Sequence, residues 1–131
     1  MTNTFHDIGI ARQIGTYSDA VEVPANARWL VTAGTPGLAL DGTLPDDITG
    51  QAEMTWMHIL AMLERAGMTV HDLVKITQYL VRRSDIPAYA RVRSRMLGDA
   101  RPASTLLVVP DSLVRPEFLL EIEAVAARAA A

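Results

Sequence analysis

The chain contains no cysteine in its 131 residues. It therefore has no disulfide bond, no thiolate nucleophile and no cysteine-based metal site, and packing alone must hold its core. It also lacks an uninterrupted apolar run of about eighteen residues, the length needed to cross a bilayer. The amino terminus (MTNTFHDIGI) has neither the basic start nor the apolar run of a secretory signal. We therefore expect a cytoplasmic protein without a membrane partner.

Lysine is nearly absent, since eleven of the twelve cationic residues are arginines, and the formal net charge is −3. Domains that bind nucleic acids are usually basic, so we do not expect a nucleic-acid partner. Several arginines nevertheless crowd into the span 82–101. This cluster predicts a solvated helix face with its flanking turns, and the alternative is a patch for phosphate or carboxylate groups. Its members are Arg82, Arg83, Arg91, Arg93, Arg95 and Arg101.

Metal-ligand spacing is also missing. His6, His58 and His71 lie far apart in the sequence and in different predicted elements. No two of them have the separation that a shared metal ion requires within one element. We therefore predict no metal site.

The length and a hydrophobic content of 50% suit one soluble domain over residues 1–131, with a single two-layer core. Apolar segments at 21–23 and 29–33 flank a turn that contains Pro24 and Asn26, which predicts a hairpin. Residues 34–45 hold three glycines and two prolines. Those residues interrupt regular structure, so this span is expected to be a loop over the sheet edge.

Two helices are predicted downstream of that loop. The first starts at Asp46 or Asp47, runs to Ala66 and stops at Gly67. The second is capped by Ser84 or Asp85, carries Pro87 in its first turn and ends near Gly98. Strands are expected at residues 73–81, 106–109 and 119–126, followed by a fraying alanine-rich tail at 126–131.

This element order predicts an α+β fold in which two crossover helices cover one face of a mixed sheet. On the last strand, Leu120, Ile122, Ala124 and Ala126 alternate with Leu119, Glu121, Glu123 and Val125. The first set suits the helix side, and the second leaves a half-apolar face with two carboxylates. Such a face is best covered by another copy of the chain, so we expect an oligomer.

Several motifs occur in the order known from one protein family. They are Gly15-Thr16-Tyr17-Ser18-Asp19-Ala20, the strand end at Val31 to Gly34, Gln51-Ala52, Glu64-Arg65-Ala66-Gly67, Asp72-Leu73-Val74-Lys75, Pro102-Ala103 and Glu121-Ile122-Glu123-Ala124. Together they make residues 14–127 resemble the Rid family, also called YjgF/YER057c/UK114. The colinearity of these motifs is more specific than any one of them.

The resemblance implies a chorismate-mutase-like α+β subunit with a mixed six-stranded sheet. It also implies a homotrimer with a central β-barrel and a cleft at each subunit interface. Typical members hydrolyse reactive enamine or imine intermediates to ketoacids and ammonia. In that scheme an arginine fixes the substrate carboxylate and a glutamate helps to activate water, with no metal or organic cofactor.

The chain departs from this pattern at the arginine. Tyr17 and Glu121 match the cleft tyrosine and the water-orienting glutamate, but Ser104 stands at the arginine position and Ala33 where a serine is frequent. Serine lacks both the charge and the planar fork of a guanidinium, and leaving a carboxylate unpaired costs about 2–5 kcal/mol. Arg101 should point away from the face of Ser104, because neighbouring side chains of an extended segment alternate. Arg115 remains an open alternative as a donor from a loop.

We therefore expect a Rid-like trimer that handles a small imine, enamine or carbonyl metabolite in an interfacial cleft, but not as an arginine-dependent 2-imino acid deaminase. Glu121 would be the catalytic acid/base group, with a structural carboxylate as the alternative. Ser104 would be a neutral donor suited to an uncharged or bulkier substrate. The substrate-binding residues would be Tyr17, Ala33, Gly34, Thr35, Ser104 and Thr105.

Two functions of other classes stay open. The same cleft could belong to a non-catalytic module that binds a small metabolite. The arginine cluster could contact RNA, a function suggested by older ribonuclease labels of the family that the chain resembles.

Overall fold

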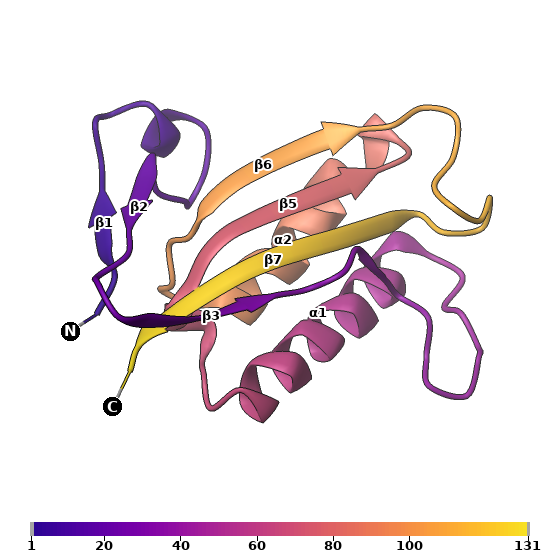
Figure 1. Ribbon diagram of the computed structural model, residues 1–131. Coiled ribbons are helices and arrows are strands. Elements are labelled where there is room, and N and C mark those ends of the chain that lie inside the picture. Colours follow the sequence, from indigo (N-terminus) through magenta and orange to yellow (C-terminus); the bar gives the residue numbers. More distant parts are fainter. Residues whose placement is uncertain (1, 131) are drawn as a thin grey trace.

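The computed structural model describes residues 2–130, and within them a mixed sheet of five strands has two α-helices against one face (Figure 1). The strand order is β3 (Ala27–Val31), β7 (Leu120–Ala129), β5 (Leu73–Leu80) and β6 (Ala103–Val108). The short β4 (Thr35–Pro36) also pairs with β7. β5 and β6 run parallel, whereas β7 is antiparallel to β3, β4 and β5. The predicted α+β class with a mixed sheet is confirmed.

Helix α1 (Ile48–Arg65) follows the predicted start and stop signals closely. The Asp47 side chain caps it by accepting a 2.8 Å hydrogen bond from the Gly50 amide. Gly67, just beyond its end, has a φ of +69°, a conformation that glycine adopts without steric cost. Helix α2 (Ile86–Leu97) has the predicted proline in its first turn and Gly98 after its last residue.

Asp85 does not act as the predicted side-chain cap of α2. Its carboxylate instead accepts a 2.9 Å hydrogen bond from Nε of Arg82, within a short 3₁₀ turn, η3 (Arg83–Asp85), that precedes the helix. An ion pair with Arg82 therefore replaces the cap.

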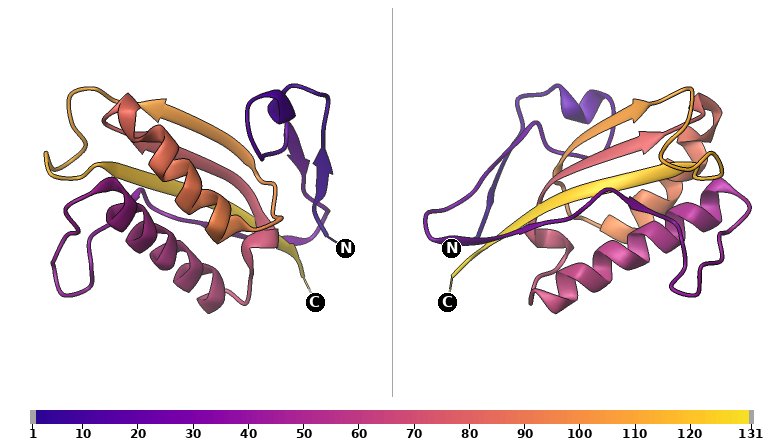
Figure 2. Two further views of the ribbon diagram at one scale, coloured as in Figure 1. Left: turned by 180° about the vertical axis from the view of Figure 1, so that it is seen from behind. Right: turned by 45° about the vertical axis from the view of Figure 1, so that its right-hand side comes forward.

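The core lies between the helices and one face of the sheet, which Figure 2 shows from the helix side. α1 buries Trp56 and Ile59, and α2 buries Tyr89 and Val92. The sheet contributes every second residue of its central strands, namely Ile76, Gln78 and Leu80 of β5 and Leu120, Ile122, Ala124 and Ala126 of β7. The predicted inward face of the last strand is confirmed.

The predicted hairpin of residues 21–33 is wrong. β2 (Ala20–Glu22) pairs with β1 (Thr4–His6) in a separate two-stranded sheet, while β3 pairs with β7, 94 or more residues away. The expected sheet of six strands is therefore a sheet of five strands beside a small hairpin, at least over residues 2–130. The turn at Asn26, with a φ of +63°, redirects the chain from one sheet to the other.

Two strand boundaries also differ from the prediction. β6 begins at Ala103 rather than at residue 106, because its backbone pairs with β5 from Lys75 onward. β7 extends to Ala129, since Ala127 and Ala129 face Trp29 and Ala27 of β3. The alanine-rich segment expected to fray is therefore strand as far as Ala129.

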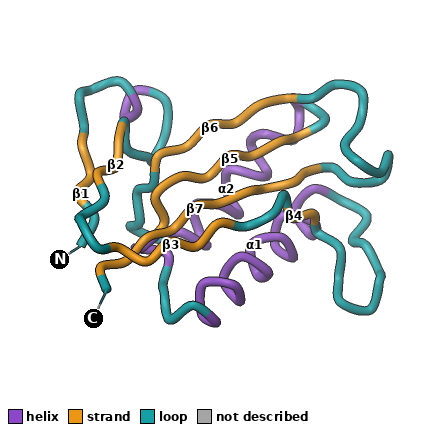
Figure 3. The backbone as a smooth tube through the Cα atoms, in the orientation of Figure 1, coloured by secondary structure: helices purple, strands orange, loops and turns teal. Residues whose placement is uncertain are grey.

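Two long loops are tied to α1 by one buried residue. The side chain of Gln51 donates to the carbonyls of Pro45 and Glu117 and accepts from the Leu119 amide. These bonds hold the loop that leads from β4 into α1 (Figure 3), together with the connection between β6 and β7. No helix in residues 2–130 is long and apolar enough to span a membrane.

Candidate functional site

A cavity of about 340 Å³ lies where α2, β6 and the loop after η1 (Ala11–Gln13) meet. Tyr17 and Ser104, two of the predicted site residues, line it together. Ile86 and Leu106 supply apolar walls, and Arg93 of α2 adds a cation. Small-molecule sites are typically concave and mostly apolar with a few placed polar groups, so this cavity is a candidate ligand site.

The Ser104 hydroxyl is held by a buried glutamine of the neighbouring strand. Nε2 of Gln78 donates to Oγ of Ser104 at 2.8 Å and to the Thr105 carbonyl at 3.0 Å. Oε1 of Gln78 accepts from the Tyr89 hydroxyl and, at 3.4 Å, from the Arg93 guanidinium. A carbonyl only accepts and a guanidinium only donates, so these partners fix the orientation of the amide.

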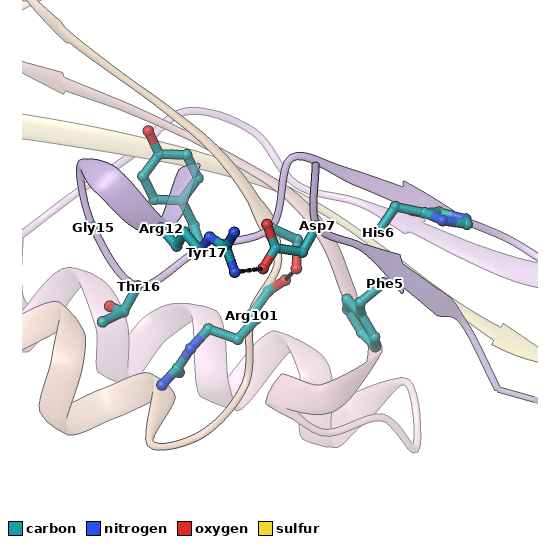
Figure 4. Close-up of a pocket in the computed structure, with 9 residues that line it drawn as sticks. Phe5, His6, Asp7, Arg12, Gly15, Thr16, Tyr17 and Arg101 are labelled. Carbon is teal, nitrogen blue, oxygen red and sulfur yellow. Dashed lines mark hydrogen bonds and ion pairs between the residues drawn. The ribbon is translucent and has the colours of Figure 1, made fainter. Parts of the chain in front are cut away.

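Arg101 does not reach this cavity. It lines a neighbouring pocket of about 430 Å³ that also contains Arg12 and Asp7, and its guanidinium donates to the carbonyls of Gly98 and Ala100. Figure 4 shows the Arg101 guanidinium and the Tyr17 ring pointing away from each other. The expectation that Arg101 points away from the face of Ser104 is confirmed. Arg115 lies over the Phe118 ring, 5.4 Å from its centroid, and is not among the residues that line the Ser104 cavity.

Glu121 lies on the opposite face of the sheet from Ser104. Ser104 pairs with Ile76, and Leu106 with Gln78, which places Ser104 on the helix side. Glu121 pairs with Tyr79 and therefore projects from the face that the helices leave bare. One subunit cannot bring the two side chains into the same cavity.

The predicted residues around position 33 do accompany Glu121. Thr35 and Pro36 of β4 pair with Ile122 and Glu121, so the segment from Ala33 runs beside the carboxylate. A methyl group at Gly34 would lie 3.1 Å from Oε2 of Glu121. Glycine at this position therefore leaves the carboxylate accessible from the loop side.

The environment of Glu121 favours its neutral form. Partial burial raises the pKa of its carboxyl group, and the negative charge of Glu123 raises it further. The Tyr79 hydroxyl donates a 2.6 Å hydrogen bond to Glu123, not to Glu121. On this face the Glu123 carboxylate is thus held by the Tyr79 hydroxyl, and the pKa of Glu121 is raised.

Thr105 lies on the same bare face as Glu121 but is not paired in register with it. Its hydroxyl accepts a 2.6 Å hydrogen bond from the Lys75 ammonium group. It pairs with Thr77, which in turn pairs with Glu123. The seven predicted site residues therefore lie in separate places: Tyr17 with Ser104, Ala33 and Gly34 beside Glu121, Thr35 opposite the inward-facing Ile122, and Thr105 with Lys75.

The histidines have separate surroundings. His6 contacts Glu22, His58 contacts the Leu38 carbonyl, and His71 contacts Asp99. Within residues 2–130 no group of three or more His, Asp or Glu side chains is arranged to hold a metal ion.

The family model described as Endoribonuclease L-PSP matches residues 10–128. The chain belongs to the Rid (YjgF/YER057c/UK114) family. A RutC family protein of Pyrococcus abyssi is 31% identical over 119 residues, which cover 88% of each chain. The crystal structure of YyfB, a Rid family protein of unknown function from Yersinia pestis, superposes with a TM-score of 0.83 at 26% identity, over 98% of this chain and all of that one.

A third relative of this Rid family chain carries a functional name. TdcF of Escherichia coli, provisionally named a reactive intermediate deaminase, is 26% identical over 119 residues, covering 89% of this chain and 90% of TdcF. TdcF with bound serine has been solved as a crystal structure, and it superposes with a TM-score of 0.73 at 25% identity, covering 88% and 91% of the two chains. The match places TdcF, which carries this provisional name, among the relatives of the chain.

Sequence reasoning missed Gln78 and the location of Arg93 in this Rid family subunit. Gln78 carried a usable signal, because it is a polar residue between Ile76 and Leu80 on the inward face of a central strand. Arg93 follows Ile86 and Ala90 at helical spacing on one face of α2. Arg93 was considered only as one member of the arginine-rich span, and its position on the helix face with Ile86 and Ala90 was not used.

Proposed function

We propose that this Rid family protein handles a small imine, enamine or carbonyl metabolite, in a cleft that two copies of a homotrimer complete between them. Family membership and the TdcF relative support the class of substrate. The opposite placement of Ser104 and Glu121 supports the shared cleft, because only a second copy could present Glu121 to the cavity at Ser104.

Glu121 carries the proposal. It projects from the bare sheet face beside Gly34, with a carboxyl pKa raised by burial and by Glu123. A raised pKa brings the pKa of a carboxylate closer to the pH at which the enzyme works. The carboxylate is then a stronger proton acceptor and a better general base.

The proposed reaction is hydrolytic deamination. Glu121 accepts a proton from water while the water oxygen attacks the imine carbon, and it passes this proton to the imine nitrogen, so that a neutral carbinolamine with one hydroxyl and one amino group forms. Glu121 then takes the hydroxyl proton and delivers it to the amino nitrogen as the carbonyl group forms, the C–N bond breaks and ammonia departs. An imine and one water thus yield one carbonyl compound and one ammonia. An enamine first takes a proton at carbon to form the imine.

Ammonia release from 2-aminoacrylate and from larger enamines tests this reaction. We expect the native protein to accelerate release and Glu121→Gln to lower kcat by about a hundredfold or more, since positioned general bases contribute roughly 10²–10⁴. The matched control is Glu123→Gln, which changes the same charge on the same strand face. Its activity should persist, with the acidic limb of the pH profile moved to lower pH because the repulsion on Glu121 is gone. No acceleration with any substrate would exclude the reaction.

A module that binds a metabolite without turnover is the second candidate, and the formed cavity at Ser104 favours it. Ligand that binds only the native state raises the melting temperature. A melting temperature raised by the carbonyl compounds that enamines yield on hydrolysis, with no ammonia release from the enamines themselves, would support this candidate over the enzyme.

A further inference from the structure

Four of the six arginines of the span 82–101 are exposed, as predicted, whereas Arg93 and Arg101 are half-buried. Arg82 pairs with Asp85 and Arg95 with Glu53, while Arg101 contacts backbone carbonyls. Arg93 differs from these three. It lines the cavity with Tyr17 and Ser104, and none of the ion pairs within residues 2–130 involves it.

Neutral groups hold the Arg93 guanidinium in position. It lies over the Tyr89 ring, 5.8 Å from the centroid, and donates one hydrogen bond to Oε1 of Gln78. A guanidinium has five N–H donors, so most of them remain available. Tyr89 and Gln78 are both fully buried, so the groups that contact Arg93 are packed into the core.

The Ser104 hydroxyl adds a second donor on the same wall. Its oxygen accepts from Gln78, so its own proton is left to donate, and no bond donated by it occurs within residues 2–130. The Gln78 amide spans the distance between the guanidinium and the hydroxyl. Beside these polar groups, Ile14, Ile86 and Leu106 provide an apolar lining.

We infer that Arg93 supplies the cationic contact of this cavity, and that the ligand is a small molecule with a carboxylate on a short aliphatic body. The guanidinium fork matches a carboxylate in a planar, two-point contact. A volume of about 340 Å³ admits only a small ligand. This inference deepens the proposed function by naming its substrate class, and it replaces the expectation of an uncharged substrate, which considered position 104 alone.

The same geometry explains why a neutral residue is acceptable at position 104. An arginine there would place a second guanidinium beside Arg93, and like charges in a partly buried site repel. In this chain helix α2, and not strand β6, supplies the cation of the cavity.

Binding of butanoate and of its neutral isostere butanamide, measured by NMR titration of the native protein, tests the inference. Butanoate should bind at least tenfold more tightly than butanamide. Arg93→Gln should remove this preference, and Arg93→Lys should retain part of it, because lysine keeps the charge but not the fork. The matched control is Arg91→Gln, an exposed arginine of the same helix outside the cavity, which should leave the preference intact.

A double variant shows that a lost preference reflects lost charge and not a damaged fold. Ser104→Arg combined with Arg93→Gln should restore tight butanoate binding, because it places a guanidinium on the other side of Gln78. Ser104→Arg alone should add little. Equal binding of the two probes by the native protein, or an unchanged preference in Arg93→Gln, would overturn the inference.

Ammonia release measured on the same samples separates this inference from the proposed function. Carboxylate binding that depends on Arg93, without turnover of any enamine, would leave the inference standing and exclude the enzyme. Turnover of an enamine, with carboxylate binding that does not change in Arg93→Gln, would support the enzyme and exclude the inference.

Discussion

Glu121 is a carboxylate that the fold makes costly to ionise. Burial and the neighbouring Glu123 raise its pKa, and Gly34 leaves its Oε2 without a side chain against it on the loop side. A group with these properties at the edge of a bare sheet face is suited to proton transfer.

Glu121→Gln should make the native state more stable at pH 7. A carboxyl whose pKa is higher in the folded than in the unfolded state favours folding while it is protonated, and this contribution is lost as pH rises through the folded pKa. The glutamine of the variant does not ionise, so its contribution to stability does not fall as pH rises. Thermal unfolding should show the variant melting above the native protein at pH 7, with the difference vanishing below the ordinary pKa of glutamate. A variant that melts at or below the native protein at pH 7 would contradict this.

Gln78 is a neutral polar residue whose side chain lies in the core. Its amide forms hydrogen bonds with Ser104, Thr105, Tyr89 and Arg93. Because every polar atom of the amide has a partner, the network joins strand, helix and cavity without an unpaired group. The orientation of Arg93 thus depends on a residue of β5.

At the scale of elements, the loop from β4 to α1 is fixed by close approach of two backbones. A Cβ on Gly37 would lie 2.7 Å from the Cα of Gln51 and would also meet the Gln51 carbonyl oxygen. Backbone cannot move aside as a flexible side chain does. The loop therefore requires glycine at position 37 for space and not for its φ angle.

Gly37→Ala should destabilise the protein by about 1–3 kcal/mol, the usual cost of overpacking. Denaturant unfolding measures this loss. The control is Leu40→Ala in the same loop, where the side chain is 99% exposed and the change should stay within about 0.5 kcal/mol. Equal stability of the two variants would show that the loop shifts away from α1.

At the scale of the whole molecule, one sheet face is bare in the single chain. Trp29 is 57% exposed and Val31 71% exposed on β3, and Leu107 of β6 is 43% exposed on the same face. Apolar groups on a sheet face beside two carboxylates are expected to be covered by further copies. This is the surface on which the proposed trimer would assemble.

Leu107→Arg should dissociate the trimer into subunits, because burying an unpaired charge in an interface costs several kcal/mol. Light scattering coupled to size-exclusion chromatography gives the mass directly. Leu40→Arg, on the loop before α1, should remain trimeric. A native protein with the mass of one subunit, or a trimer that tolerates Leu107→Arg, would contradict the assembly.

The sequence alone was enough for both helices, the inward face of β7 and the family. Asp47, Pro87 and the glycines at 67 and 98 act within a few residues of their positions, so local rules predict them. The alternation of Leu120 and Ile122 with Glu121 and Glu123 is likewise local. These features depend on neighbours in the chain, and a linear pattern records them.

Only the tertiary structure decided which strands pair, which face each site residue occupies and where the cation of the cavity lies. β2 and β3 adjoin in sequence, yet each finds a partner elsewhere, because pairing depends on surfaces that distant segments present. For the same reason Ser104 and Glu121 lie on opposite faces, and Arg93, eleven residues before Ser104 and on another element, lines the same cavity. Such neighbours are set by packing in three dimensions, which a linear pattern does not record.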